Sequence, residues 1–580
     1  MKKNAKASLP DKTKAVFSAR PVIYQMLPRL FANKCDKRVP NGDIHTNGSG
    51  KLNDITPAVL KSIKGLGATH VWYTGIVEHA QCSDYTRYGI RRDNPYIVKG
   101  KAGSPYAIKD WYDIDPDVAE NVPERMAEFE ALVARTHKAG LKVITDLVPN
   151  HVARQYHSDS APAGVSDFGR FDDTDVFFTP DNNFYYIPRQ RFSPSIPLGS
   201  GKDEYVEFPA KCTGNDCYTA YPSANDWYET VKLNYGYDPG NRSTHFWPIP
   251  RTWNDMLKIM IFWASKGIDG LRCDMVHMVP VEFWQWAIPQ VKARYPELIF
   301  IAEIYDVALY RDYINRGGFD YLYDKVTLYD TLRGIDTAGT SAAQLTSCWQ
   351  TVEGISGNML NFLENHDEQR YASRQYMGRP DTVLPALVAI ATINTGAVMI
   401  YMGQELGESA PDAEGFSGQD GRTTIFDYWS LDCLQRWLGP DFKATGSKLF
   451  KSEKQLRDTY ASVLALVNGC EAVRNGSFFD LTYANYHNER FNPHRHFAYL
   501  RRSPQAGSTV LVVLNFNDET DSISVNIPRH AFDCLGILPR TGIDARNLLT
   551  GSDTTINFTD AAPTPVTVPA HGAIVLEFKD

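Results

Sequence analysis

The sequence predicts an α/β fold: a parallel (β/α)8 barrel, a small domain inserted after the third strand, and a C-terminal all-β sandwich. Three observations predict it. Short apolar runs alternate with helical patterns over most of residues 21–471, which is the order typical of a parallel sheet. Eight such runs occur, and eight strands close a barrel. The alternation is interrupted over residues 152–245, and after residue 471 it gives way to apolar runs separated by turn residues.

The predicted strands are short apolar runs, most of them followed by polar or turn residues. They are residues 22–26, 70–74, 141–146, 270–274, 298–303, 319–323, 358–363 and 398–401. Thr56 and Pro57 open the first helix as N-cap and first-turn proline. Pro123 opens a second helix, whose apolar residues keep helical spacing until Gly140. An open doubly wound sheet is the alternative, but the glycine-rich phosphate turn that normally follows its first strand is not found in this sequence.

The two interruptions predict two further domains. Residues 152–245 are rich in Asp, Pro and aromatic residues, and a structureless loop of that length is uncommon inside a compact domain. The alternating or apolar runs 497–500, 510–516, 523–527 and 574–578 predict a β-sandwich. The expected organisation is a flexible N-terminus over 1–20, a barrel over 21–151 and 246–471, an inserted domain over 152–245, and a C-terminal sandwich over 472–580.

Composition excludes several classes of protein. With 43% hydrophobic and 22% charged residues, the chain has a globular composition and not a disordered one. Its 60 basic and 68 acidic residues give a net charge of −8, so no global positive field attracts nucleic acid. The sequence contains no run of about 18 apolar residues that would span a membrane, and its basic start lacks the apolar stretch of a signal peptide. We therefore expect a cytoplasmic protein without nucleic-acid or membrane partners; its oligomeric state stays open.

Carboxylates and histidines gather at the carboxyl ends of the predicted strands, where barrel enzymes carry their functional residues. These residues are Asp146, Asn150 and His151 after the third strand, Arg272 and Asp274 on the fourth, Glu303 on the fifth, and His366 and Asp367 after the seventh. A lone strand-end Asp is usually a helix cap or a surface ion pair. Several carboxylates at one barrel mouth repel one another, so their convergence favours catalysis. Paired carboxylates suggest glycosidic-bond chemistry, in which one attacks the anomeric carbon and the other protonates the leaving oxygen.

Four short motifs resemble those of the alpha-amylase family, glycoside hydrolase family 13. They stand in order on the third, fourth, fifth and seventh predicted strands: Asp146-Leu-Val-Pro-Asn150-His151, Gly270-Leu-Arg272-Cys-Asp274, Ile301-Ala-Glu303 and Phe362-Leu-Glu-Asn-His366-Asp367. One such motif could arise by chance, whereas four in order on a predicted barrel are specific. The resemblance covers nearly the whole chain. It implies a TIM barrel and a retaining hydrolase that cleaves α-1,4-glucosidic bonds in starch-like α-glucans or maltooligosaccharides.

The resemblance implies a role for individual residues. Asp274 would be the nucleophile, Glu303 the general acid and then the base, and Asp367 a ligand of the sugar hydroxyls. Arg272 would hold Asp274 ionised and oriented. The other residues implied to bind substrate are Tyr106, which would stack beneath the sugar, His151, His277, His366 and Arg370.

The resemblance also implies a structural calcium between the barrel and the insert, with Asn150 as a ligand. Calcium takes hard oxygen ligands, and the insert offers carboxylates to complete such a set: Asp167, Asp172, Asp173 and Asp175. An asparagine that caps a loop is the alternative. We expect no organic cofactor.

Two departures from the family pattern bear on the substrate. Many alpha-amylases carry Lys-His three and four positions after the nucleophile, where this chain has His277 and Met278. Exo-acting alpha-glucosidases often have an Asp where this chain has Gly103, which favours an enzyme that accepts longer α-glucans. A 4-α-glucanotransferase or an α-glucosidase on the same scaffold stays open. A non-catalytic binding module is a further alternative, but such relatives typically lose part of the carboxylate set that this chain keeps.

Overall fold

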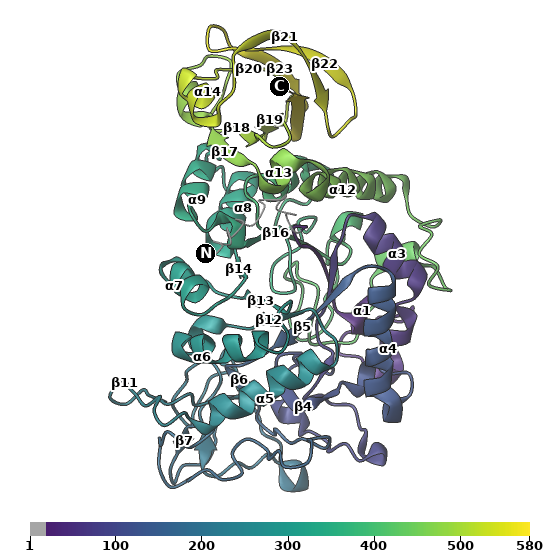
Figure 1. The fold of residues 1–580 in the computed structure, drawn as a ribbon. Coiled ribbons are helices and arrows are strands. Elements are labelled where there is room, and N and C mark those ends of the chain that lie inside the picture. Colours follow the sequence, from purple (N-terminus) through teal and green to yellow (C-terminus); the bar gives the residue numbers. More distant parts are fainter. Residues whose placement is uncertain (1–18, 580) are drawn as a thin grey trace, which may run out of the picture.

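A computed structural model describes residues 19–579, and it confirms the predicted parallel barrel (Figure 1). Eight strands close the sheet, each pairing in parallel with the next, and the last returns to the first. In chain order they are β1 (Val22–Met26), β2 (His70–Tyr73), β5 (Lys142–Leu147), β12 (Gly270–Cys273), β13 (Ile299–Ala302), β14 (Tyr321–Tyr323), β15 (Met359–Asn361) and β16 (Ala397–Tyr401). The predicted N-terminal segment 1–20 lies, except for its last two residues, outside the described residues.

Helices surround this barrel. The main ones are α3 (Pro57–Gly65), α4 (Arg125–Lys138), α5 (Arg251–Ser265), α6 (Val281–Lys292), α7 (Tyr310–Asn315), α8 (Asp330–Thr337), α9 (Leu345–Thr351), α10 (Leu384–Thr392) and α12 (Lys451–Gly469). The predicted cap of α3 is present, because the Thr56 hydroxyl accepts a hydrogen bond from the Val59 N–H. The helix predicted from Pro123 begins two residues later, after a 3-10 turn over Val122–Glu124. Among the described residues, no helix combines the length and apolar composition that crossing a membrane requires.

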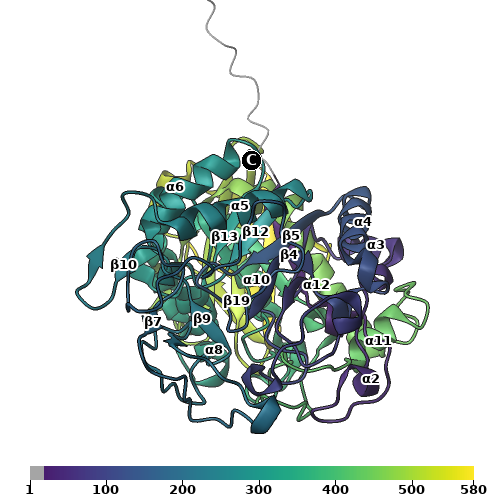
Figure 2. The ribbon, with the colours of Figure 1, turned by 90° about the horizontal axis from the view of Figure 1, so that it is seen from below.

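The insert consists of short strands and turns at the end of the molecule opposite the C-terminal sheet (Figure 1). Its strands pair two by two: β6 (His151–Ala153) with β9 (Thr230–Lys232), β7 (Tyr186–Ile187) with β8 (Ala210–Lys211), and β10 (Tyr237–Asp238) with β11 (Ser243–Thr244). Figure 2 looks from below onto the end of the barrel where β7, β9 and β10 gather. The pair β6–β9 joins the first and last parts of the insert directly after β5, so it fixes the root of the insert against the barrel.

The C-terminal region forms the predicted β structure with a core of its own. A six-stranded sheet has the order β17 (Ser477–Asp480), β18 (His496–Ser503), β19 (Ser508–Asn515), β24 (Gly572–Lys579), β21 (Arg540–Asn547) and β22 (Asp553–Phe558). The pair β20 (Asp521–Val525) and β23 (Thr564–Val568) forms a second sheet. The structure adds two short helices that the pattern did not predict, α13 (Glu471–Asn475) at the start of this region and α14 (Arg529–Leu535). Segments of five and seven residues are too short to show a clear helical period.

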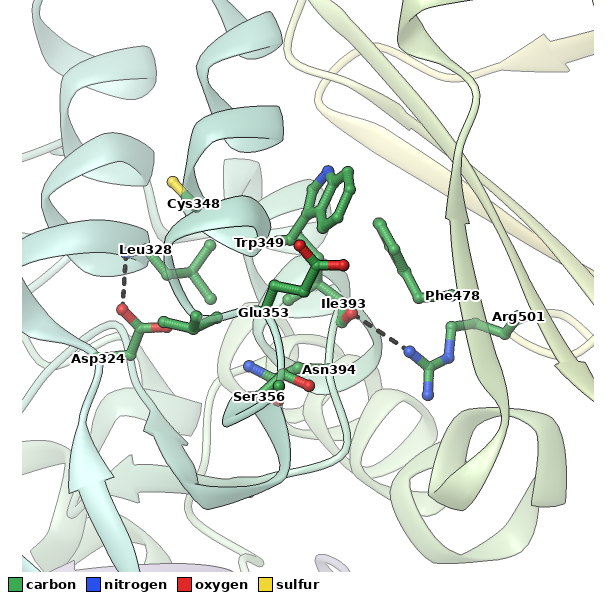
Figure 3. A pocket seen from close by; sticks show the side chains of 12 residues that line it. Asp324, Leu328, Cys348, Trp349, Glu353, Ser356, Ile393, Asn394, Phe478 and Arg501 are labelled. Carbon is green, nitrogen blue, oxygen red and sulfur yellow. Dashed lines mark hydrogen bonds between the residues drawn. The ribbon is translucent and has the colours of Figure 1, made fainter. Parts of the chain in front are cut away.

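Arg501 of β18 joins this sheet to the barrel. Its side chain is buried and donates hydrogen bonds to four backbone carbonyls: Ile393 at 3.3 Å, Ala472 at 3.2 Å, Val473 at 3.5 Å and Gly476 at 2.6 Å. The same guanidinium borders a cavity of about 170 Å³ between the barrel helices and the sheet (Figure 3). The contact therefore depends on a buried charge that is satisfied by backbone oxygens.

We predict that Arg501→Met destabilises the chain by at least about 3 kcal/mol, because four backbone carbonyls lose a donor at once. Chemical unfolding of the purified protein measures the effect. Arg529→Met is the control, since this arginine is exposed. We expect its free energy of unfolding to lie within about 0.5 kcal/mol of the wild-type value. Equal midpoints for the two variants would contradict the importance of the Arg501 contact.

Candidate active site

A cavity of about 320 Å³ lies between the carboxyl ends of the barrel strands and the insert. Five residues predicted from the sequence line it together: Tyr106, His151, Asp274, Glu303 and Asp367. The smaller cavity of Figure 3 contains none of these residues. The predicted carboxylates therefore converge at one place, and we take this cavity as the candidate active site.

Arg272 connects the carboxylates at the floor of the cavity. It lies on β12 in register with Asp146 of β5. One guanidinium nitrogen, Nη1, donates to Asp274 Oδ1 at 2.8 Å, and the other, Nη2, lies 2.7 Å from Glu303 Oε2. Nε donates to the Tyr323 hydroxyl at 3.2 Å. Because the arginine side chain is fully buried, these ion pairs lie in a low-dielectric environment where they are stronger than at the surface.

Glu303 is held from three sides. Besides Arg272, its Oε2 accepts a hydrogen bond from the Met275 N–H at 2.9 Å, and its Oε1 accepts one from the Tyr305 hydroxyl at 2.5 Å. Met275 follows Asp274 directly and has a φ of 44°, a left-handed conformation that is unfavourable for a side chain of this size. In this conformation the Met275 N–H donates to Glu303, so the residue next to Asp274 holds the Glu303 carboxylate.

Burial and charge repulsion change the acidity of this cluster. Burial and the neighbouring Glu303 carboxylate raise the pKa of Asp274 well above its usual range, and Arg272 opposes the shift. Burial likewise raises the pKa of Asp367, with a further contribution from Glu303. Asp274 and Asp367 therefore hold a proton more readily than an exposed aspartate does, although the Arg272 charge opposes both pKa shifts.

His366 lies beside this cluster as a neutral ring. Burial and the Arg272 charge keep its pKa well below the usual value. Gln25 Nε2 lies 2.8 Å from His366 Nδ1, so Nδ1 accepts and the proton resides on Nε2. Nε2 lies 3.1 Å from Asp367 Oδ2 and 2.5 Å from the Tyr106 hydroxyl. The Tyr106 ring stacks on the imidazole at 5.1 Å, which fixes the two rings against each other; Tyr106 lines the cavity, whereas His366 itself does not.

The other two predicted histidines occupy different places. His151 is buried at the start of β6, lines the cavity and contacts the Trp227 ring at 5.2 Å. His277 lies in the turn Val276–Met278, partly exposed, with its ring 6.3 Å from that of Tyr305. His277 is therefore next to the residue that holds Glu303, although it does not line the cavity itself.

The structure does not bring Arg370 to the cavity. Its guanidinium is fully buried and pairs with Glu364 at 2.9 Å, and it donates to the Met402 carbonyl at 2.9 Å and to Thr423 Oγ1 at 2.8 Å. Glu364 stands three residues before Asp367 on the same loop. Arg370 therefore supports the loop that carries Asp367, and we do not retain it among the residues that contact substrate.

Several cavity residues were not predicted from the sequence. Tyr305 stands two positions after Glu303, and this short spacing was the available signal. Lys99, Trp227, Glu229 and Phe426 also line the cavity, and Lys99 pairs with Glu229 at 3.0 Å. They come from loops and from the insert, where no periodic pattern indicates which side chains face the site.

The residues around Asn150 do not fit the calcium site that was expected. Asn150 lies between barrel and insert as predicted, but its Oδ1 accepts a hydrogen bond from the ammonium group of Lys232. Three of the four candidate acids are engaged elsewhere, and the fourth, Asp175, is exposed. Asp172 accepts from the Asn183 N–H at 2.8 Å, Asp167 pairs with His157 at 2.7 Å, and Asp173 accepts from the Asp175 N–H at 3.0 Å. No calcium ligand set forms at Asn150 among the residues from 19 to 579.

A separate acidic group lies beneath the root of the insert. Carboxylate oxygens of Glu78, Asp110 and Asp113 lie within 4.8 Å of one another, all buried, on the strand pair β3 (Val77–His79) and β4 (Ile108–Ile114). Lys109 approaches Glu78 at 3.6 Å, and Arg125 pairs with Asp113. These cations compensate part of the negative charge.

Comparison with known proteins agrees with this geometry. Residues 25–432 match the model of the alpha-amylase catalytic domain. The chain belongs to the alpha-amylase family. Residues 497–578 match a second model, the C-terminal β-sandwich domain of alpha-galactosidase. Membership of the alpha-amylase family thus confirms the family resemblance of the four motifs.

Relatives within the alpha-amylase family differ in their named activities. An alpha-amylase of Streptomyces lividans is 24% identical over 91% of this chain and 56% of its own length. An alpha-1,4-glucan:maltose-1-phosphate maltosyltransferase of Rhodospirillum rubrum is 34% identical over 36% of this chain and 30% of its own length. The chain therefore spans about half or less of these curated relatives.

Solved structures share the fold of this alpha-amylase family member. A maltogenic alpha-amylase of Thermotoga neapolitana superposes with a TM-score of 0.61 at 20% identity, covering 97% of this chain and 99% of its own. An alpha-amylase of Geobacillus thermoleovorans, complexed with acarbose, has a TM-score of 0.61 at 19% identity, covering 97% and 98% of the two chains. These structures contain equivalents of nearly the whole chain.

Proposed function

We propose that the protein is a retaining glycoside hydrolase that cleaves α-1,4-glucosidic bonds in starch-like α-glucans or maltooligosaccharides. The observation that carries the proposal is the Arg272 guanidinium, which joins Asp274 and Glu303 on the floor of a cavity that Asp367 also lines. Three carboxylates at one cavity are costly for stability because they repel one another. A catalytic role accounts for their convergence.

In the first chemical step, Asp274 attacks the anomeric carbon while Glu303, in its protonated form, transfers its proton to the glycosidic oxygen. The bond from carbon to leaving oxygen breaks, and a covalent glycosyl-Asp274 ester forms. Arg272 supports this step because it contacts both carboxylates, so it faces one negative charge before the step, on Asp274, and one after it, on Glu303. Tyr305 and the Met275 N–H fix the direction of the Glu303 carboxyl group.

In the second step, ionised Glu303 removes a proton from water, and the resulting oxygen attacks the anomeric carbon and displaces Asp274. Both partners return to their starting protonation states. Asp367 and the neutral His366, which presents an N–H at Nε2, provide an acceptor and a donor for neighbouring sugar hydroxyls. The Tyr106 ring offers an apolar face to the sugar, with Arg272 positioned 5.2 Å from its centre.

The loop at Gly103 bears on the length of the substrate. Gly103 has a φ of 73°, and a Cβ at this position would lie 1.7 Å from the Ala80 carbonyl oxygen. No side chain fits there, so the aspartate that grips the chain end in exo-acting alpha-glucosidases has no room. This supports action on longer α-glucans over a dedicated exo-glucosidase.

A glucanotransferase is the second candidate function, because a maltosyltransferase is among the relatives and transfer uses the same glycosyl-enzyme. Incubation of the purified protein with maltoheptaose separates the two. We expect products shorter than the substrate, as water is the acceptor in a hydrolase. Products longer than maltoheptaose would instead establish transfer to a second sugar, and the absence of any product would contradict both readings.

Asp274→Asn and Glu303→Gln are expected to lower activity on starch, by about 10²–10⁴-fold for the acid and at least as much for the nucleophile. An activated substrate with a leaving group that needs no proton separates their roles. Glu303→Gln should still release that leaving group in a first turnover, whereas Asp274→Asn should not.

Asp324→Asn is the control, because this buried carboxylate lies at the other cavity, and we expect it to keep its activity. Full activity in Asp274→Asn or Glu303→Gln would contradict the mechanism.

The pH dependence follows from the raised pKa of Asp274. Attack requires ionised Asp274, so kcat/KM should fall as the pH falls through that pKa, at a value above the usual Asp value of about 3.9. Arg272→Met removes the opposing positive charge and should move this acidic limb to higher pH. Arg316→Met, on the surface, should leave it unchanged. A limb at the usual Asp value, or one that Arg272→Met does not move, would contradict this explanation.

A further inference from the structure

The joint between the barrel and the insert contains a buried lysine at its centre. Lys232 ends β9 and pairs in register with His151 of β6, and its side chain is only 6% exposed. The ammonium nitrogen contacts three oxygens. It donates to Asn150 Oδ1 and, at 3.0 Å, to the Met278 carbonyl, and it lies 2.8 Å from Asp216 Oδ1. An ammonium has three N–H donors, so these contacts satisfy all of them.

The three oxygens come from three separate segments. Asn150 follows the barrel strand β5, Met278 belongs to the turn that follows Asp274, and Asp216 lies in the insert between β8 and β9. The orientation of the Asn150 amide is fixed independently, because its Nδ2 donates to the Gly214 carbonyl at 2.7 Å. Lys232 thus holds the insert, the end of β5 and the loop after Asp274 together through one charge.

An amide oxygen, a backbone carbonyl and a carboxylate are the oxygen types that bind calcium in proteins. Here the ammonium occupies the space between them, and only one of the three groups is charged. Lys232 and Asp216 balance each other, whereas a calcium ion would add two positive charges next to the lysine. We propose that the Lys232 ammonium takes the place of a structural calcium at this joint, so that the insert is held to the barrel by an internal cation and needs no metal there.

The test measures thermal unfolding of the full chain in excess EDTA and in excess calcium chloride, and it does not depend on the proposed catalytic activity. We expect the wild-type Tm to be the same in both. Lys232→Ala should unfold several degrees lower in EDTA, because three oxygens lose their donor, and the Asn150 oxygen among them is buried. Calcium should then restore part of the loss, since the substitution opens a space among oxygen ligands.

Lys211→Ala is the matched control. This insert lysine contacts the Arg154 carbonyl, Glu207 and the Phe184 ring, all within the insert, so calcium should not restore its Tm. Two results would overturn the proposal. One is a wild-type Tm that is lower in EDTA than in calcium by as much as the Tm of Lys232→Ala. The other is a rise in Tm on adding calcium that is no larger for Lys232→Ala than for Lys211→Ala. If Lys232→Ala fails to fold, limited proteolysis of the wild type decides: cleavage of the insert at the same rate with and without EDTA supports the proposal, and faster cleavage in EDTA overturns it.

Discussion

The buried guanidinium of Arg272 is the interaction on which the active site depends. A positive charge without solvent needs partners, and Arg272 finds them in Asp274 and Glu303 at 2.8 and 2.7 Å. The same contacts make it possible to bury two carboxylates at one cavity, since their repulsion is offset by a shared cation. In the proposed mechanism, this arrangement lets the negative charge move between nucleophile and acid without a change of counter-ion.

The barrel supplies this geometry through strand register, and internal cations hold the loops around it. Parallel pairing places Asp146 beside Arg272 on adjacent strands, which brings the strand ends to one cavity. Arg370 then supports the loop of Asp367 through Glu364, and Lys232 connects the insert to the turn after Asp274. Each of these buried cations holds a loop that no helix or strand pairing fixes in place.

Much of this architecture could be predicted from the sequence because it depends on local patterns. All eight strands were visible as short apolar runs, and the three carboxylates stood at strand ends within specific motifs. Contacts between distant segments could not be predicted. The burial of Arg370 against Glu364, the place of Lys232 against Asn150, and the approach of Trp227 to His151 depend on loop conformations that carry no periodic signal. The steric reason for Gly103 likewise required the position of the Ala80 carbonyl.

The most direct test of the proposed mechanism is to trap the covalent intermediate. A fluorinated α-glucosyl fluoride, which slows hydrolysis of the glycosyl-enzyme, would be incubated with the intact chain, followed by digestion and mass spectrometry. The mechanism predicts one added fluoroglucosyl group, located on the peptide that contains Asp274 and attached to that side chain. An adduct on another residue, or rapid turnover with inversion at the anomeric carbon, would contradict the role of Asp274 as the nucleophile.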